Sequence, residues 1–96
     1  MIGSITEYPV RPDALSAFQS LARELAVKVQ GQEPGCLTYR FYRPRNGATA
    51  MVLIEEYADE AAFAIHGGQP YVTELAPRLH ALCEGAPDIR VYEAVE

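Results

Sequence analysis

The 96-residue sequence predicts a single α+β domain, residues 1–96, in which two helices cover one face of a four-stranded antiparallel sheet. Strand-like segments and segments with apolar residues at helical spacing follow one another in the order β-α-β-β-α-β. The pair Asn46-Gly47 lies between the second and third strands, and such pairs are typical of tight hairpins between antiparallel neighbours. This order is the split arrangement of ferredoxin-like domains.

The first strand and the first helix follow from residue types. Ile2–Tyr8 contains β-branched residues and precedes two prolines, which favours a strand. From Asp13, which can cap a helix, apolar residues recur at intervals of three and four. The apolar face comprises Leu15, Phe18, Ala22, Leu25 and Val29. Gly31 and the turn Glu33-Pro34-Gly35 end this helix, because glycine accepts the backbone angles of a sharp reversal.

The second half of the chain repeats this organisation. Asp59 can cap a short helix that extends to about His66 and stops at Gly67-Gly68. Pro70 can open another helical stretch, since proline suits the first turn of a helix. The apolar spacing of this stretch is carried by Val72, Leu75, Leu79 and Leu82. The last strand, Ile89–Val95, alternates apolar and polar residues.

The two strands of the hairpin differ in polarity. One face of the second strand carries Leu37, Tyr39 and Phe41, and the other carries Thr38, Arg40 and Tyr42. The third strand begins with four apolar residues, so Met51 and Leu53 lie on one face, while Val52 and Ile54 lie on the other. The helices of one chain cover only one face, and soluble monomers rarely expose a contiguous apolar patch. We therefore expect a two-fold homodimer through the other face. The alternative is a solvated outer face that is more apolar than average.

Composition excludes several classes of function. The net charge is −5, and the only basic cluster is Arg40, Arg43 and Arg45, so binding to a nucleic-acid backbone is not expected. The N-terminus lacks the pattern of a signal peptide, and no apolar run approaches the length of a membrane span. We expect a cytoplasmic protein without a membrane partner. Cys36 and Cys83 are read as two reduced, buried thiols without chemistry.

Few residues could carry chemistry. There is no hydrolase-like Ser/His/Asp set and no pair of histidines or cysteines at metal-ligand spacing, so no metal site is predicted. His66, three residues after Phe63, could act as a general base, or its charge could simply favour a helix C-terminus. His80 is read as a structural or surface residue. Tyr71 could extend its ring and hydroxyl over a pocket, although tyrosines are also ordinary core residues.

Glu55 and Tyr57 share a strand face with Met51 and Leu53. If that face borders a cavity, all four side chains border it. A carboxylate in an apolar strand needs a partner, and Arg40 on the neighbouring strand is the expected one. That pair would have a structural role.

The joint spacing of these residues resembles that of a known family. The segments are Leu53-x-Glu55-x-Tyr57-x-Asp59-x-x-Ala62-x-x-x-His66, preceded by Glu33-Pro34-Gly35-Cys36-Leu37 and followed by Gln69-Pro70-Tyr71-Val72-x-x-Leu75. They resemble the antibiotic biosynthesis monooxygenase family, including its quinol monooxygenase members, and the likeness covers nearly the whole chain. The resemblance implies a dimeric α+β barrel with an apolar pocket between the sheet and the helices of each subunit.

The resemblance also implies a reaction. Members that need neither flavin nor metal oxidise quinols or polyketide-like aromatics with molecular oxygen, because the deprotonated substrate itself passes an electron to oxygen. Here His66 would be the base, with Tyr57 and Tyr71 as pocket walls or hydrogen-bond donors. Glu55 and Arg40 would support them. The substrate would contact these two residues together with Met51, Leu53 and Phe63.

Departures from the family pattern narrow the choice of activity. Haem-degrading relatives carry an asparagine, a tryptophan and a ligand histidine where this chain has Thr6, His66 and Ala76, and the chain contains no tryptophan. Haem degradation is therefore disfavoured, and no cofactor is expected. Because one fold supports many functions, two alternatives stay open: a non-enzymatic module that binds a small aromatic ligand, and a cofactor-free isomerase of a small carbonyl compound.

Overall fold

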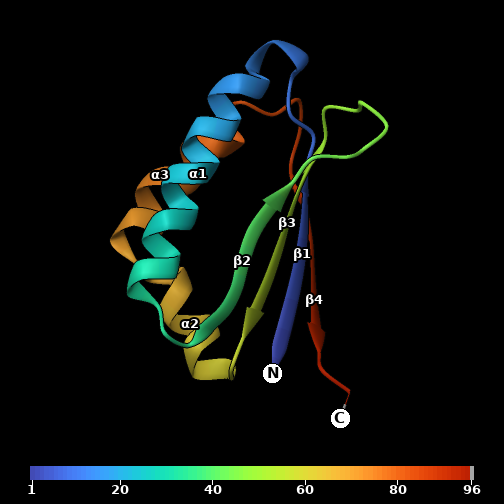
Figure 1. The fold of residues 1–96 in the computed structure, drawn as a ribbon. Coiled ribbons are helices and arrows are strands. Elements are labelled where there is room, and N and C mark those ends of the chain that lie inside the picture. The colour runs from blue at the N-terminus through green and yellow to red at the C-terminus, as the bar shows by residue number, and fades with distance from the viewer. Residues whose placement is uncertain (96) are drawn as a thin grey trace.

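The computed structural model describes residues 1–95 and has two layers (Figure 1). Along the chain the elements are β1 (Ile2–Tyr8), the 3-10 helix η1 (Pro12–Ala14), α1 (Leu15–Gln32), β2 (Cys36–Tyr42), β3 (Met51–Tyr57), α2 (Glu60–Gly67), α3 (Pro70–His80) and β4 (Asp88–Glu93). All three α-helices lie on one side of the sheet (Figure 1). The predicted α+β fold with a four-stranded sheet is confirmed.

The strands are ordered β2-β3-β1-β4, so β1 and β3 are central and β2 and β4 form the edges. Every neighbouring pair is antiparallel. Paired residues project to the same face, so the pairs Ser4–Glu55 and Thr6–Leu53 fix which side chains of the two central strands face the helices. The inner face of the sheet is built from these alternate positions.

The helices cover the inner face with the apolar stripes expected from the sequence. In α1 the buried residues are Phe18, Ala22, Leu25 and Val29, and in α3 they are Tyr71, Leu75 and Leu79. They pack on inner-face side chains of the sheet, including Tyr8, Tyr39, Met51 and Leu53.

No helix within residues 1–95 combines the length and the apolar character needed to cross a membrane.

The start of α1 differs from the prediction. Asp13 does not cap this helix, because Pro12 opens η1 and the Ala14 amide hydrogen bonds to the carbonyl of Arg11 at 2.9 Å. The Asp13 carboxylate instead lies 3.4 Å from Nε of Arg11. Proline suits the first turn of either helix type, and the sequence pattern did not separate the two. By contrast, Asp59 caps α2 as predicted and accepts a bond of 2.8 Å from the Ala62 amide.

The connection between β2 and β3 is wider than the tight hairpin that was predicted. It spans residues 43–50. Within the described residues only Gly47 has a positive φ, 82°, a value that residues with a side chain rarely adopt. Asn46 instead accepts a hydrogen bond of 3.0 Å from the Ala48 amide through its side chain. The strands are nevertheless antiparallel neighbours, as predicted.

Two further differences concern strand ends. A bulge lies between Cys36 and Thr38, and it leaves Leu37 exposed instead of on the inner face. The last strand ends at Glu93, two residues before the predicted Val95, although the Ala94 amide still bonds to the carbonyl of Met1 at 2.9 Å.

The outer face of the sheet carries an apolar strip across its central strands. Ile5 of β1 pairs with Ile54 of β3, and Val52 lies on the same face of β3. Ile5 is 42% exposed, and Tyr42 and Tyr92 on the two edge strands are also exposed. None of the helices within residues 1–95 covers this side (Figure 1).

Both cysteines are free thiols, as predicted, but they are only partly buried, whereas buried thiols were predicted. The Cys36 thiol donates to the carbonyl of Thr38 at 3.3 Å. Burial, together with the charges of nearby carboxylates, raises the pKa of Cys36 to about 11. This side chain is therefore a neutral thiol at physiological pH.

Candidate functional site

A pocket of about 560 Å³ lies between the inner face of the sheet and the helices α2 and α3. It is lined by Ser4, Thr6, Tyr8, Leu25, Tyr39, Leu53, Glu55, Phe63, Ala64, His66, Gly67, Val72, Ala76, His80 and Ile89. We call it the inner pocket. It opens beside β4, where Ile89 lines it and is itself 59% exposed. Its size and its mostly apolar wall are those of a small-molecule site.

His66 is a polar side chain in this wall that contacts a buried carboxylate. Its Nδ1 lies 3.0 and 3.1 Å from the two carboxylate oxygens of Glu33, a residue that is only 5% exposed. The hydroxyl of Tyr71 donates to the same carboxylate. Glu33 therefore joins the end of α1 to α2 and α3 through a buried polar cluster.

Local structure fixes the position of His66. The residue lies in the last turn of α2, which begins at the Asp59 cap and ends before Gly68. This helix packs closely on the turn after α1, because a Cβ added to Gly35 would lie 2.7 Å from the Cβ of Ala62. The absence of a side chain at Gly35 thus lets α2 approach close enough for His66 to reach Glu33.

Glu55 lies on the other side of the imidazole. Its Oε1 is 3.8 Å from Nε2 of His66, which is too long for a hydrogen bond, and it accepts one of 2.6 Å from the hydroxyl of Tyr57. Burial raises the pKa of Glu55 above its usual range, and the bond from Tyr57 and the nearby imidazole partly oppose this shift. Glu55 is thus a buried acid at the pocket wall, and its neighbours offset only part of the cost of burying its charge.

Three tyrosines enclose the two carboxylates. The rings of Tyr39 and Tyr57 lie with their centroids 5.3 and 5.5 Å from that of His66. Burial, and secondly the charge of Glu55, raises the pKa of both hydroxyls. Burial and the bond to Glu33 raise the pKa of Tyr71. All three hydroxyls consequently stay protonated at neutral pH, where they can donate to a carboxylate.

This arrangement defines the tautomer of His66. An ionised carboxylate only accepts hydrogen bonds, so the Nδ1 that faces Glu33 carries the hydrogen. In the neutral ring, Nε2 then holds the free electron pair on the side of Glu55 and the inner pocket. A base oriented by a buried carboxylate is the geometry that proton-abstracting sites require.

The structure brings together only some of the residues predicted for the site. Of these, Leu53, Glu55, Phe63 and His66 line the inner pocket. Tyr57 is fully buried and reaches Glu55 and His66 from behind the wall. Tyr71 does not extend over the pocket, because its hydroxyl turns to Glu33. Met51 borders a different hollow beside α1.

The prediction that Arg40 pairs with Glu55 is wrong. Arg40 lies opposite Ile54, and Tyr39 lies opposite Glu55. Since neighbours in a strand point to opposite faces, Arg40 projects from the outer face while Glu55 projects inward. The partners of Glu55 are Tyr57 and the more distant His66, not a cation on the neighbouring strand.

Sequence reasoning missed Glu33, Tyr39 and His80. Glu33 was read only as part of the turn after α1, and its place in the family-like segment was the one available signal. His80 was expected to be structural or superficial, and it is exposed yet lines the inner pocket. Thr6 and Ala76, the positions at which haem-degrading relatives differ, line the same pocket.

No group of three or more His, Cys, Asp or Glu side chains within residues 1–95 has a geometry that could hold a metal ion.

Known proteins resemble this chain along its whole length. The family model for antibiotic biosynthesis monooxygenase matches residues 1–78. A crystal structure of an antibiotic biosynthesis monooxygenase is 31% identical, with complete coverage of both chains and a TM-score of 0.91. A candidate antibiotic biosynthesis monooxygenase from Caulobacter crescentus is 33% identical, covers 99% of this chain and 90% of its own, and has a TM-score of 0.94. An uncharacterised protein from Synechocystis is 26% identical over 91% of this chain, which spans 58% of that protein's length.

Proposed function

The chain belongs to the antibiotic biosynthesis monooxygenase family, and from this premise we propose that it oxidises a small aromatic substrate of the quinol or polyketide type with molecular oxygen, without a cofactor. The observation that carries the proposal is the position of His66. Its imidazole lies in the wall of an apolar pocket, with Nδ1 held by the buried Glu33. Nε2 is left to accept a proton.

In the proposed reaction His66 removes the proton of a phenolic hydroxyl. The resulting anion is electron-rich, and it transfers an electron to oxygen without a protein-bound redox group. Glu33 and Glu55 on either side of the ring stabilise the imidazolium that forms. A positioned general base of this kind typically accelerates a reaction about 10²- to 10⁴-fold.

The atoms balance without an external reductant. One oxygen atom becomes a new hydroxyl oxygen of the product, the two hydroxyls of the hydroquinone become carbonyls, and the other oxygen atom leaves as water. A hydroquinone and one O₂ thus give a hydroxyquinone and one water. All electrons come from the substrate, so the reaction requires only an apolar pocket and one base from the protein. The pocket volume of about 560 Å³ suits a ligand of one to a few rings.

We further propose that the working form is a homodimer closed through the outer face of the sheet. Ile5, Val52 and Ile54 form an apolar strip on that face, and α1, α2 and α3 lie on the other side. A second copy related by a two-fold axis would cover the strip and leave the inner pocket of each subunit free.

Oxygen uptake with a panel of quinols tests the catalytic proposal. We expect consumption above the buffer rate for at least one quinol, with product mass increased by the net gain of one oxygen atom and loss of two hydrogens. His66→Ala should lower kcat by about 10²-fold or more, since it removes the base. Lys28→Gln, a change at an exposed site on α1, is the matched control and should leave the rate unchanged.

Three results would contradict parts of the proposal, and the first two would exclude an oxygenase. Tight binding of an aromatic ligand without turnover would indicate a binding module. Turnover without oxygen consumption would indicate an isomerase. Equal rates for wild type and His66→Ala would remove His66 from the mechanism.

A further inference from the structure

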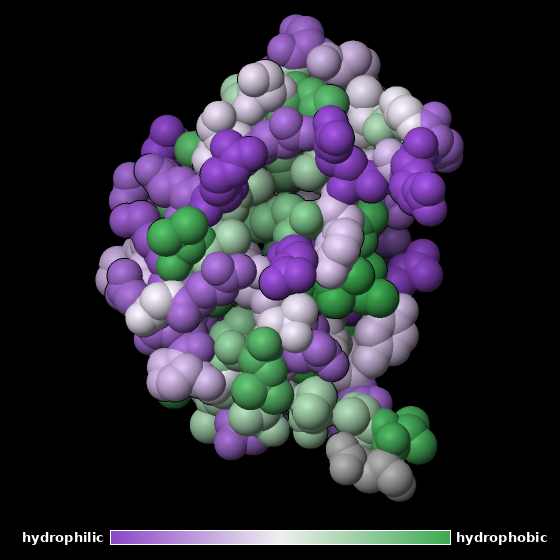
Figure 2. Space-filling view, in the orientation of Figure 1, coloured by the Kyte–Doolittle hydropathy of each residue, from purple (hydrophilic) through white to green (hydrophobic). Residues whose placement is uncertain are grey.

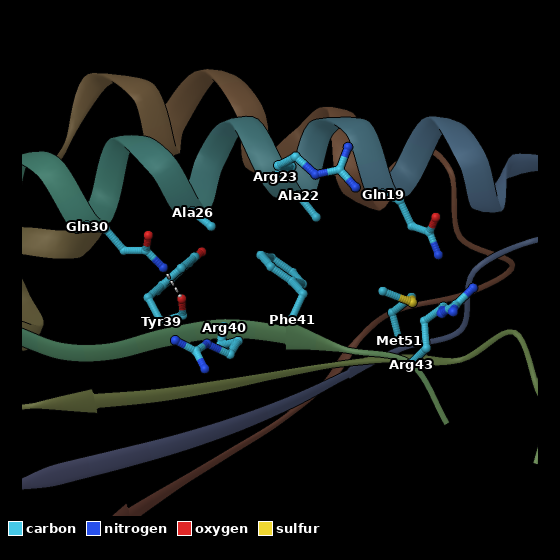
Figure 3. Close-up of a pocket in the computed structure, with 10 residues that line it drawn as sticks. All are labelled: Gln19, Ala22, Arg23, Ala26, Gln30, Tyr39, Arg40, Phe41, Arg43 and Met51. Atoms are coloured by element: carbon cyan, nitrogen blue, oxygen red, sulfur yellow. Dashed lines mark hydrogen bonds between the residues drawn. The ribbon is translucent and has the colours of Figure 1, made fainter. Parts of the chain in front are cut away.

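A second hollow, outside the inner pocket, lies between α1 and the edge strand β2 (Figure 3). Its volume is about 480 Å³, and its walls are formed by Gln19, Ala22, Arg23, Ala26, Gln30, Tyr39, Arg40, Phe41, Arg43 and Met51. We call it the arginine groove. In Figure 2 the visible face has a hollow with hydrophilic residues at the rim and pale green, moderately apolar residues in its floor.

The groove concentrates positive charge on an acidic protein. Two cationic side chains, Arg23 and Arg43, border it in a chain whose net charge is −5, and no Asp or Glu lines it. Arg40 is a third arginine in its lining, but its side chain projects from the outer face of the sheet. Within residues 1–95, no carboxylate lies within 4 Å of Arg23, Arg40 or Arg43. In Figure 3, Arg23 comes from α1 and Arg43 from the residue after β2, while the Arg40 side chain lies on the side of β2 away from α1.

The floor of the groove is apolar because α1 presents small residues there. Ala22 and Ala26 are one turn apart and leave a gap to the strand, and the side chain of Phe41 points into this gap (Figure 3). Met51 closes the floor and is 4% exposed. At one end, Gln30 donates a bond of 3.0 Å to the main-chain carbonyl of Tyr39. The groove is therefore apolar at its base and cationic at its mouth.

We propose that the arginine groove binds a small organic carboxylate with an aromatic or other apolar body. A guanidinium group matches the geometry of a carboxylate with two parallel hydrogen bonds, and the apolar floor would hold the ring. A volume of about 480 Å³ lies within the range of small-molecule sites. The site is distinct from the inner pocket, although Tyr39 belongs to the walls of both.

Titration of the full chain with 4-ethylbenzoate, with 4-ethylbenzamide as the uncharged analogue, tests this inference by calorimetry and by amide NMR. We expect the carboxylate to bind at least about tenfold more tightly than the amide, because only the carboxylate can form charge-assisted hydrogen bonds with the guanidinium groups. Arg23→Gln and Arg43→Gln should each weaken its binding about tenfold. Lys28→Gln removes an exposed cation of α1 outside the groove and should leave the affinity unchanged.

A steric variant separates shape from charge. Ala26→Leu should fill the floor and abolish binding of 4-ethylbenzoate while Arg23 and Arg43 remain. Thermal melting shows whether each variant is folded, and shifted amide signals of Ala22 and Phe41 place the ligand. His66→Ala should bind 4-ethylbenzoate as wild type does, so that a failure of the proposed oxygenase activity leaves this result standing.

Several outcomes would overturn the inference. Equal affinity for carboxylate and amide would remove the role of charge. Undiminished binding by the double variant Arg23→Gln/Arg43→Gln would exclude these side chains. Shifts centred on His66 and Ile89 would place the ligand in the inner pocket. Equally tight binding of inorganic phosphate would reduce the groove to a generic anion site.

Discussion

Nδ1 of His66 lies 3.0 Å from Oε1 of Glu33, across a sequence separation that spans the whole β2–β3 hairpin. The carboxylate is 5% exposed and also accepts from Tyr71, so it has a fixed position and a fixed orientation. This one contact selects the tautomer of the imidazole and leaves Nε2 for chemistry. Glu33 is consequently a positioning residue in the proposed reaction.

Glu33→Gln should reduce kcat by roughly 10²-fold with a smaller change in KM, because the amide can present a donor to Nδ1 and turn the base into the unproductive tautomer. Steady-state oxygen uptake measures both constants. The matched control is Glu24→Gln, an exposed position on the same helix, which should change neither constant. A change in KM alone would show that Glu33 shapes the pocket without orienting His66.

Glu55→Gln should alter the pH dependence of stability. Burial raises the pKa of Glu55 above the ordinary value of 4.5, so the folded protein holds this proton more firmly than the unfolded chain does. As pH rises above 4.5, the unfolded chain is the first to lose the proton, and the wild-type free energy of unfolding decreases until pH passes the native pKa. Glutamine does not titrate and avoids this loss.

The difference in unfolding free energy, variant minus wild type, should therefore increase from about pH 4.5 upward and then level off, by about 1.4 kcal/mol for each unit of raised pKa. Urea unfolding at a series of pH values between 4 and 8 measures it. Glu24→Gln, at an exposed position, is measured alongside as the matched control. A difference for Glu55→Gln that stays constant over this pH range would contradict the raised pKa.

Gly35→Ala should destabilise the protein by about 1–3 kcal/mol, because the new methyl group would lie 2.7 Å from the Cβ of Ala62 and α2 would have to move. Activity should decrease as well, since the same movement separates His66 from Glu33. Chemical denaturation and oxygen uptake measure the two effects.

Two controls isolate the contact between Gly35 and Ala62. Ala62→Gly should restore space, so that the double variant is more stable than the sum of the single changes predicts. Gly31→Ala has no atom within 4 Å of its added Cβ and should be neutral or stabilising by up to about 1 kcal/mol. Equal losses at Gly31 and Gly35 would show that the close approach of α2 is unimportant.

Ile54→Lys should convert the proposed homodimer to monomers, because it places a charge in the apolar strip of the outer face beside Ile5. Sedimentation at micromolar concentration should give a dimer for wild type and a 10.6 kDa species for the variant. Val27→Lys changes an apolar residue of α1 that is 64% exposed, and it should remain dimeric. A folded wild-type monomer under these conditions would contradict the proposal.

Much of the fold could be predicted because the relevant signals are local. The stripe from Phe18 to Val29 identifies α1 and its buried face. The apolar run that begins at Met51 after the Asn46-Gly47 turn identifies β3, and the two-residue repeat of a strand puts Leu53 and Glu55 on the same face. Each pattern records a single period, 3.6 for a helix and 2 for a strand, and needs no knowledge of the neighbouring elements. The predicted inward direction of Glu55 is correct for this reason.

The polar partners inside the site required the tertiary structure. Strand register, together with the bulge before Thr38, places Tyr39 and not Arg40 opposite Glu55. The turn after α1 carries Glu33 beneath α2, where it meets His66. Both contacts join segments far apart in the sequence, and neither leaves a periodic trace. The residue sequence therefore determined which faces are apolar, whereas packing between elements decided which charged groups are buried together, because the cost of burying a carboxylate depends on partners that only the folded chain supplies.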